Sequence, residues 1–257
     1  MNYWDTIILG LIQGLTEFLP ISSSGHLVLG KYLLGAEMPG VMFELVVHFG
    51  TLMSVLVYFR KRIYRLVQSV YTPDMVEERK MILYLALGMV PAVLIALLLS
   101  NQIERAFASP FASSAFLIFT GIVLILTTSF NKGQRQIDAP RSLLIGFAQA
   151  LAIFPGVSRS GMTISAGLFS GVKPMVAAEY SFLLSVPAIV GAIIYKARDI
   201  IAIDKSLIGN YTVGAAVAFI SGLFAVYLLL GLIRKGKFRY FGYYCLAVGL
   251  FGILYFL

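Results

Sequence analysis

Three ionisable side chains interrupt stretches of the sequence that are otherwise apolar or rich in Gly and Ser. They are Glu17, His26 and Arg159. Charged groups held away from water are costly and persist where they bind or react, so these three are candidates for an active site. Further ionisable groups in apolar stretches are Glu44, His48 and Glu179, whose roles the sequence leaves open.

Both segments that carry the three candidates contain a Ser-x-Ser-Gly sequence, at 22–25 and at 158–161. Hydroxyls and a free first turn at the start of a helix provide an anion site, which the helix dipole reinforces. Arg159 adds a planar donor suited to phosphate. Two such helix starts facing each other predict a diphosphate pocket, although the serines could instead serve only as caps. The predicted substrate-binding residues are Ser22, Ser24, Gly25, Ser158, Ser160 and Gly161.

The acidic residue of the first segment needs a partner in such a pocket. Gln13 and Glu17 are four residues apart and share one face of a helix. A bare carboxylate would repel a diphosphate. A divalent metal ion, Mg²⁺ or Ca²⁺, is therefore predicted between Glu17 and the phosphates.

The chemical step requires a nucleophile and a base. Ser23 and His26 are three residues apart at the start of a helix, so their side chains can lie on one face. We expect His26 to act as the base, or as the direct nucleophile, with Ser23 attacking or positioning the phosphoryl group. Water activated by His26 or Glu17 is a third alternative. The predicted catalytic residues are Glu17, Ser23, His26 and Arg159.

Composition identifies the environment of these residues. The 257 residues are 59% hydrophobic and only 12% charged, with a mean hydropathy of +0.89. Such a chain cannot build the solvated shell of a soluble protein, which predicts an integral membrane protein in contact with lipids. The net charge of +8 comes from short basic clusters between apolar runs, a pattern that orients membrane helices rather than binding nucleic acid.

The apolar runs predict an all-α membrane domain. Six runs have the length of about 20 residues that a bilayer-crossing helix needs. Two further regions, 5–35 and 141–171, are broken near the middle by Pro, Gly and Ser, so each predicts a pair of re-entrant half-helices. The six predicted spans are roughly 41–59, 81–100, 111–130, 176–195, 210–233 and 239–257.

Basic residues predict the orientation. If the loop at 60–80 is cytoplasmic, 14 Lys and Arg residues lie on that side and 5 on the other. Positive charge favours the cytoplasmic side, so both termini are expected outside, in the periplasm. The pocket is then expected to open outward.

The two broken regions also resemble each other. At an offset of 136 residues, eight positions are identical, including the pairs Gln13 with Gln149 and Ser22 with Ser158. With the expected orientation, this predicts an inverted repeat within a single membrane domain, 1–257, with halves 1–130 and 131–257. The candidate residues are not repeated: Glu17 corresponds to Ile153, and Arg159 corresponds to Ser23.

Two long motifs give the chain a family resemblance. Gln-Gly-Leu-Thr-Glu-Phe-Leu-Pro-Ile-Ser-Ser-Ser-Gly-His at 13–26 and Pro-Gly-Val-Ser-Arg-Ser-Gly-Met-Thr-Ile-Ser at 155–165 are similar to the two signatures of the undecaprenyl-diphosphate phosphatase family, the bacitracin-resistance type. The resemblance covers nearly the whole chain.

The resemblance implies a metal-dependent hydrolase of the bacterial inner membrane. It would convert undecaprenyl diphosphate to undecaprenyl phosphate and inorganic phosphate, recycling the lipid carrier for peptidoglycan synthesis, cell-wall biogenesis and cell shape, and giving bacitracin resistance. It implies that Glu17 belongs to the metal-linked motif, Ser23 and His26 to the catalytic segment and Arg159 to diphosphate binding. Gln13, as the second metal ligand, stands where the family has Glu or Gln.

Two other functional classes share some of these features. A transporter or flippase of a phosphorylated lipid or anion would also use an inverted repeat with broken helices, but it does not require a Ser and His pair. The membrane acid-phosphatase class would need His at 165 and Asp at 169, where the chain has Ser165 and Phe169. The sequence does not indicate the oligomeric state.

Overall fold

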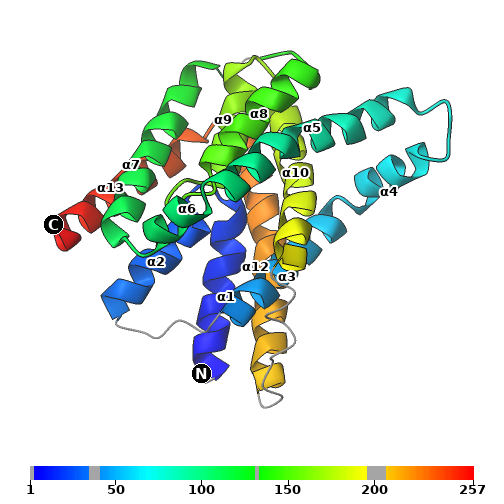
Figure 1. The fold of residues 1–257 in the computed structure, drawn as a ribbon. Helices are drawn as coiled ribbons and strands as arrows, with labels where there is room; N and C mark the ends of the chain where they lie inside the picture. The colour runs from blue at the N-terminus through cyan, green and yellow to red at the C-terminus, as the bar shows by residue number, and fades with distance from the viewer. Residues whose placement is uncertain (1–2, 35–40, 131–132, 196–206) are drawn as a thin grey trace.

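The computed structural model describes residues 3–34, 41–130, 133–195 and 207–257. These residues form helices, one isolated β-bridge between Arg135 and Val172, and no strand (Figure 1). The helices are α1 (Tyr3–Phe18), α2 (Ser23–Leu34), α3 (Val41–Tyr58), α4 (Arg60–Ser69), α5 (Val76–Leu98), α6 (Ser100–Phe107), α7 (Pro110–Leu126), η1 (Thr127–Phe130), α8 (Ala139–Leu151), α9 (Arg159–Phe169), α10 (Pro174–Tyr195), α12 (Ile208–Arg234) and α13 (Arg239–Phe256).

The expected membrane spans are confirmed as helices. Within the described residues, α5, α7 with η1, α10, α12 and α13 are each long and apolar enough to cross a bilayer. A sixth span is formed by α3 if it is counted together with α4, which bends away from it by 78°. The chain is therefore an all-α multi-pass membrane protein. The short helices α4 and α6 were not predicted.

The two broken regions each fold into two short helices, as expected. Helices α1 and α2 have 16 and 12 residues, and α8 and α9 have 13 and 11. At 1.5 Å per residue none of them reaches the roughly 30 Å of a bilayer core. The first break contains Pro20 and then Ser22, whose φ is 65°, and the second contains Gly156 with a φ of 96°.

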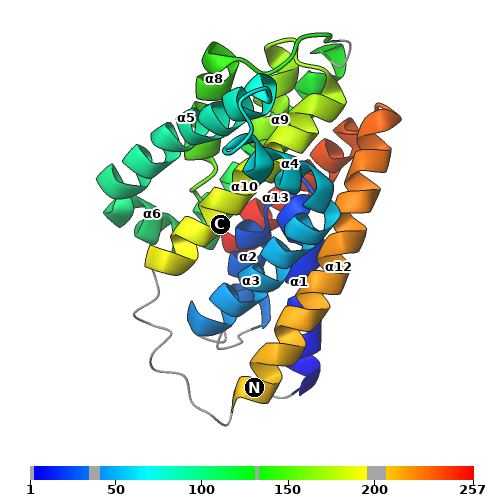
Figure 2. The same ribbon diagram turned by 90° about the vertical axis from the view of Figure 1, so that its right-hand side faces the viewer.

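The two halves of the chain are interleaved. Helix α12 of the second half lies along α1 and α3 of the first, and α5 of the first half lies against α8 of the second (Figures 1 and 2). Glycines permit both close approaches: a Cβ on Gly10 would lie 2.7 Å from the Gly214 carbonyl oxygen, and one on Gly146 would lie 2.5 Å from that of Gly88. Small residues at helix contacts are typical of packing in membranes.

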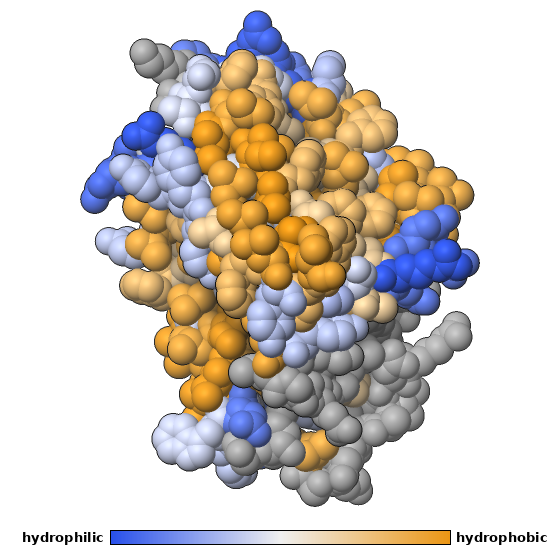
Figure 3. Space-filling model, turned by 90° about the vertical axis from the view of Figure 1, so that its left-hand side faces the viewer, coloured by the Kyte–Doolittle hydropathy of each residue, from blue (hydrophilic) through white to orange (hydrophobic). Residues whose placement is uncertain are grey.

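The outer surface matches a lipid environment. Many large apolar side chains are exposed, including Trp4, Leu98, Ile194, Tyr227 and Leu254. Figure 3 shows one face whose middle is covered largely by hydrophobic residues, with hydrophilic residues toward the top and the sides. Lipid chains would cover this surface in place of water.

Candidate active site

Glu17, in the last turn of α1, is the centre of the polar cluster. Its Oε1 accepts a hydrogen bond from Arg159 Nη2 at 2.6 Å. Its Oε2 accepts hydrogen bonds from Gln13 Nε2 at 3.0 Å and from Ser23 Oγ at 2.9 Å. The Glu17 side chain is only 8% exposed, so its carboxylate is hydrogen-bonded by protein groups in place of water.

Arg159 brings the second half of the chain into the same cluster. It is the first residue of α9, directly after Ser158, whose hydroxyl accepts from the Gly161 N–H at 3.1 Å and caps the helix. Its side chain is 16% exposed and spans from one helix break to the other. The sequence prediction that the two breaks meet is supported by this contact between residues 142 positions apart.

Ser23 begins α2 and aims its hydroxyl at Glu17, because the O–H must donate to the carboxylate in the 2.9 Å contact. His26 points elsewhere: its Nδ1 lies 2.8 Å from the Ser22 carbonyl oxygen and its Nε2 lies 2.8 Å from the Tyr244 hydroxyl. Among the described residues no hydrogen bond joins Ser23 to His26. The structure therefore brings Ser23 together with Glu17, and does not form the expected Ser23 and His26 pair.

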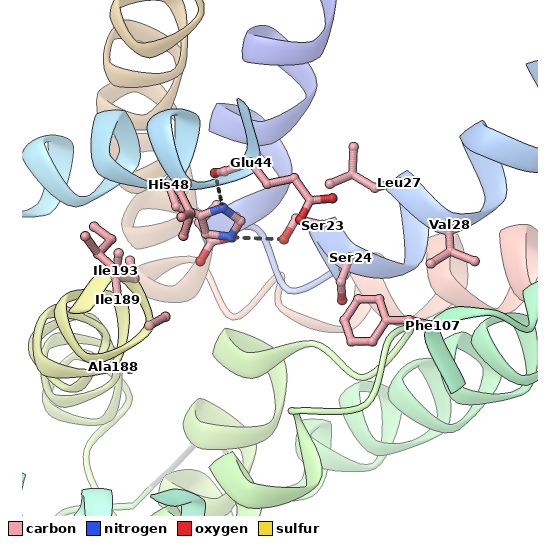
Figure 4. Close-up of a pocket in the computed structure, with 13 residues that line it drawn as sticks. Ser23, Ser24, Leu27, Val28, Glu44, His48, Phe107, Ala188, Ile189 and Ile193 are labelled. Atoms are coloured by element: carbon pink, nitrogen blue, oxygen red, sulfur yellow. Dashed lines mark hydrogen bonds and ion pairs between the residues drawn. The ribbon is translucent and has the colours of Figure 1, made fainter. Parts of the chain in front are cut away.

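A cavity of about 470 Å³ opens beside this cluster (Figure 4). Its polar end is lined by Glu17, Ser23, Ser24, Glu44 and His48. The rest is apolar, with α10 on one side and α2 and α6 on the other. Such a cavity suits a molecule with a charged head and an apolar tail. The apolar lining residues are Leu27, Val28, Leu45, Phe107, Ala188, Ile189, Ala192 and Ile193.

Of the predicted substrate-binding residues, Ser24 lines this cavity. The others make hydrogen bonds or close contacts with other parts of the protein. Ser22 Oγ accepts hydrogen bonds from the N–H groups of Gly25 and Gly156, at 3.3 and 3.1 Å, and so joins the two breaks. A Cβ on Gly25 would lie 2.8 Å from Gly156 Cα. Ser160 is buried, with its Oγ 3.4 Å from that of Ser158.

Glu44 and His48 on α3 belong to the site, a role that the sequence left open. His48 Nδ1 lies 2.7 Å from the Glu44 carbonyl oxygen, and its Nε2 lies 3.6 Å from Glu17 Oε2. The signal in the sequence was their position, one helical turn apart within an apolar span. Glu179 lies outside the cavity lining and pairs with Arg62 at 2.8 Å.

Few side chains of the described residues are placed to bind a metal ion. The described residues contain no group of three or more His, Cys, Asp and Glu side chains placed to hold an ion by themselves. Gln13 Oε1 is buried without a hydrogen-bond partner, and it belongs to the amide that contacts Glu17. A carboxylate and an amide oxygen suit Mg²⁺ or Ca²⁺ when substrate phosphates complete the shell. Of these two groups only Glu17 lines the cavity, so it is the residue that fits a metal shared with the substrate.

Comparisons with known proteins identify the family. Residues 6–251 match the family described as bacitracin resistance protein BacA. The chain is 37% identical to the undecaprenyl-diphosphatase of Salinibacter ruber, over 98% of this chain and 99% of the relative. It is 40% identical to that of Korarchaeum cryptofilum, over 97% and 98%, and 40% identical to that of Elusimicrobium minutum, over 99% and 98%.

Proposed function

The chain belongs to the BacA family of bacitracin resistance proteins, and from this premise we propose how its cavity carries out the family's reaction. The enzyme hydrolyses undecaprenyl diphosphate to undecaprenyl phosphate and inorganic phosphate. This reaction returns the lipid carrier to cell-wall synthesis. One observation carries the proposal: Glu17 lines the polar end of an amphipathic cavity together with Ser23, and it accepts hydrogen bonds from both Ser23 and Arg159.

The diphosphate occupies the polar end of the cavity, where α2 begins. Ser23 and Ser24 line this end, and no hydrogen bond among the described residues uses their backbone N–H groups. Free N–H groups at a helix start, together with the helix dipole, stabilise an anion. The apolar side chains of α2 and α10 continue from this point and suit the start of the polyprenyl chain.

Ser23 attacks the terminal phosphorus, and Glu17 takes the proton from its hydroxyl. The bond from that phosphorus to the bridging oxygen breaks, and undecaprenyl phosphate leaves with the electron pair. Water then hydrolyses the phosphoserine and releases inorganic phosphate. The direct Ser23 to Glu17 hydrogen bond supports this assignment of the base over His26.

Arg159 changes partner during this step. In the structure its guanidinium neutralises Glu17. Once Glu17 is protonated it no longer holds the cation by charge, and Arg159 is free to donate to the equatorial oxygens of the transferring phosphoryl group. Stabilisation of charge at that position is the main contribution a protein makes to phosphoryl transfer.

Glu17 is the residue that would hold a divalent cation, in company with the diphosphate oxygens. Such an ion supplies neutralisation of the phosphate charge. Glu44 lies close enough to line the same cavity and adds negative charge that attracts a cation.

The placement in the membrane follows from charge. The 14 to 5 division of Lys and Arg supports an inner-membrane orientation with both termini in the periplasm. The cavity then opens outward, as the first helix pair is expected to enter from that side.

Release of phosphate from undecaprenyl diphosphate by the purified chain tests the proposal. Ser23→Ala should reduce turnover by several orders of magnitude, because a nucleophile is lost. Ser24→Ala is the comparison variant, since it removes a neighbouring hydroxyl that lines the same cavity but does not attack, so it should lower kcat far less than Ser23→Ala. Turnover of Ser23→Ala equal to that of Ser24→Ala would exclude Ser23 as the nucleophile and favour water activated by Glu17.

A further inference from the structure

The turn that precedes α2 is held in a disfavoured conformation. Ser22 is the only non-glycine residue of the described chain with a positive φ, at 65°. A side chain disfavours this region, so the surroundings must hold it there. The Ser22 carbonyl oxygen accepts from the His26 backbone N–H at 3.2 Å and is 2.8 Å from His26 Nδ1. Since Ser23 follows directly, this turn determines where its hydroxyl lies.

The geometry around His26 determines which of its ring nitrogens carries hydrogen. A carbonyl oxygen only accepts, so Nδ1 must be the N–H that donates to Ser22. No carboxylate of the described residues hydrogen-bonds to this ring, so its hydrogen bonds supply no countercharge for a second proton. Nε2 is then the acceptor in its 2.8 Å contact, and the Tyr244 hydroxyl donates to it. Both nitrogens are therefore engaged away from Ser23.

Tyr244 comes from α13, at the far end of the chain, and also stacks on the imidazole. The two ring centroids are 5.5 Å apart, with 6° between the planes. Its position is further fixed through α13, which packs closely on α7 at Gly121 and Gly242. A single residue of α13 thus fixes the plane of the His26 ring and occupies its Nε2, while the Ser22 carbonyl oxygen determines the tautomer.

We propose that Tyr244 is a positioning residue of the phosphatase. It holds the His26 ring in place through Nε2, the Nδ1–H of His26 holds the Ser22 turn, and the turn presents Ser23 to Glu17. This inference rests on the proposed role of Ser23, and it assigns His26 to positioning in place of proton transfer.

Two phenylalanine variants of the full-length enzyme test the chain of contacts. Tyr244→Phe removes the hydroxyl and keeps the stacked ring, and kcat should fall about three- to tenfold, the scale of one neutral hydrogen bond, with KM unchanged. Tyr243→Phe is the matched control, because its hydroxyl makes no hydrogen bond within the described residues, and its kcat should equal that of the wild type. Equal kcat for both variants would overturn the proposal.

A spectroscopic measurement is independent of activity. The chain has two histidines, so ¹⁵N spectra of ring-labelled protein contain two imidazoles, which His48→Gln assigns. We expect His26 to show a protonated Nδ1 and a bare Nε2 that accepts a hydrogen bond. In Tyr244→Phe the Nε2 resonance should move downfield as that bond is lost, and in Tyr243→Phe it should stay in place.

A wild-type His26 with bare Nδ1, or an unmoved Nε2 resonance in Tyr244→Phe, would overturn the proposal even if a variant proved inactive. Failure of the proposed catalytic role of Ser23 gives a different result. In that case Ser23→Ala keeps its turnover, whatever the tautomer of His26.

Discussion

Replacing Arg159 by Lys separates the charge at the active site from its geometry. The ammonium keeps one positive charge near Glu17 but cannot donate two parallel hydrogen bonds to a phosphoryl group. Loss of one well-aligned donor in a preorganised site costs about 2–4 kcal/mol of transition-state stabilisation, which is roughly a 30- to 1,000-fold fall in kcat/KM. We expect Arg159→Lys to lie within this range.

The structure also predicts what happens to stability. Arg159 and Glu17 are 16% and 8% exposed, so this is a largely buried pair. Removing one charge, as in Arg159→Gln, leaves the other unpaired and should destabilise the fold by about 3–5 kcal/mol. Arg159→Lys keeps the pair and should cost less. Thermal unfolding in detergent separates this effect from the kinetic one.

Phosphate release under saturating and limiting substrate measures both kcat and KM for Arg159→Lys. Arg141→Lys is the matched control, because Arg141 pairs with Asp138 at the start of α8, outside the cavity lining. It should keep kcat/KM within about threefold of the wild type, because a partly exposed ion pair contributes little. Turnover of Arg159→Lys equal to that of Arg141→Lys would refute the role of Arg159 in the transition state.

Three further predictions concern the metal, the turn and the orientation. Excess chelator should abolish phosphate release and added Mg²⁺ or Ca²⁺ should restore it, since Glu17 and the diphosphate carry charges that need neutralising; full activity in chelator would remove metal from the mechanism. Gly25→Ala should unfold at a lower temperature than Gly30→Ala, because its Cβ would lie 2.8 Å from Gly156 Cα whereas Gly30 has nothing within 4 Å; equal midpoints would contradict the close contact between the breaks. A single cysteine at Ser24, introduced with Cys245→Ala, should react with an impermeant reagent from the periplasmic side; labelling only from the cytoplasm would overturn the orientation.

The positions of the membrane helices along the sequence were largely predictable, because they follow from the lengths of the apolar runs. Each span needed about 20 apolar residues, and each break needed Pro, Gly or Ser where the run was interrupted. The amphipathic helix α4 was missed because its basic residues were read only as a cytoplasmic loop. Its 78° bend after Tyr58 is a tertiary feature that apolar length does not reveal.

The partners of the candidate residues were less predictable. A spacing of three residues allows Ser23 and His26 to share a face, but it does not determine which neighbour each side chain contacts. The imidazole of His26 hydrogen-bonds to Tyr244, which lies 218 residues further along the chain, and the Ser23 hydroxyl donates to Glu17. His48 joins Glu17 only because α3 packs against α1, a contact that no local pattern encodes.

The most direct test of the account is the chemical identity of the intermediate. Rapid quenching of the enzyme with undecaprenyl diphosphate labelled in its terminal phosphate, followed by peptide mapping, should locate the label on Ser23 as phosphoserine. The label should be absent in Ser23→Ala and should still be found on Ser23 in Ser24→Ala. Label on His26 as phosphohistidine, or transfer to water without any labelled protein while turnover proceeds, would contradict attack by Ser23 with Glu17 as its base.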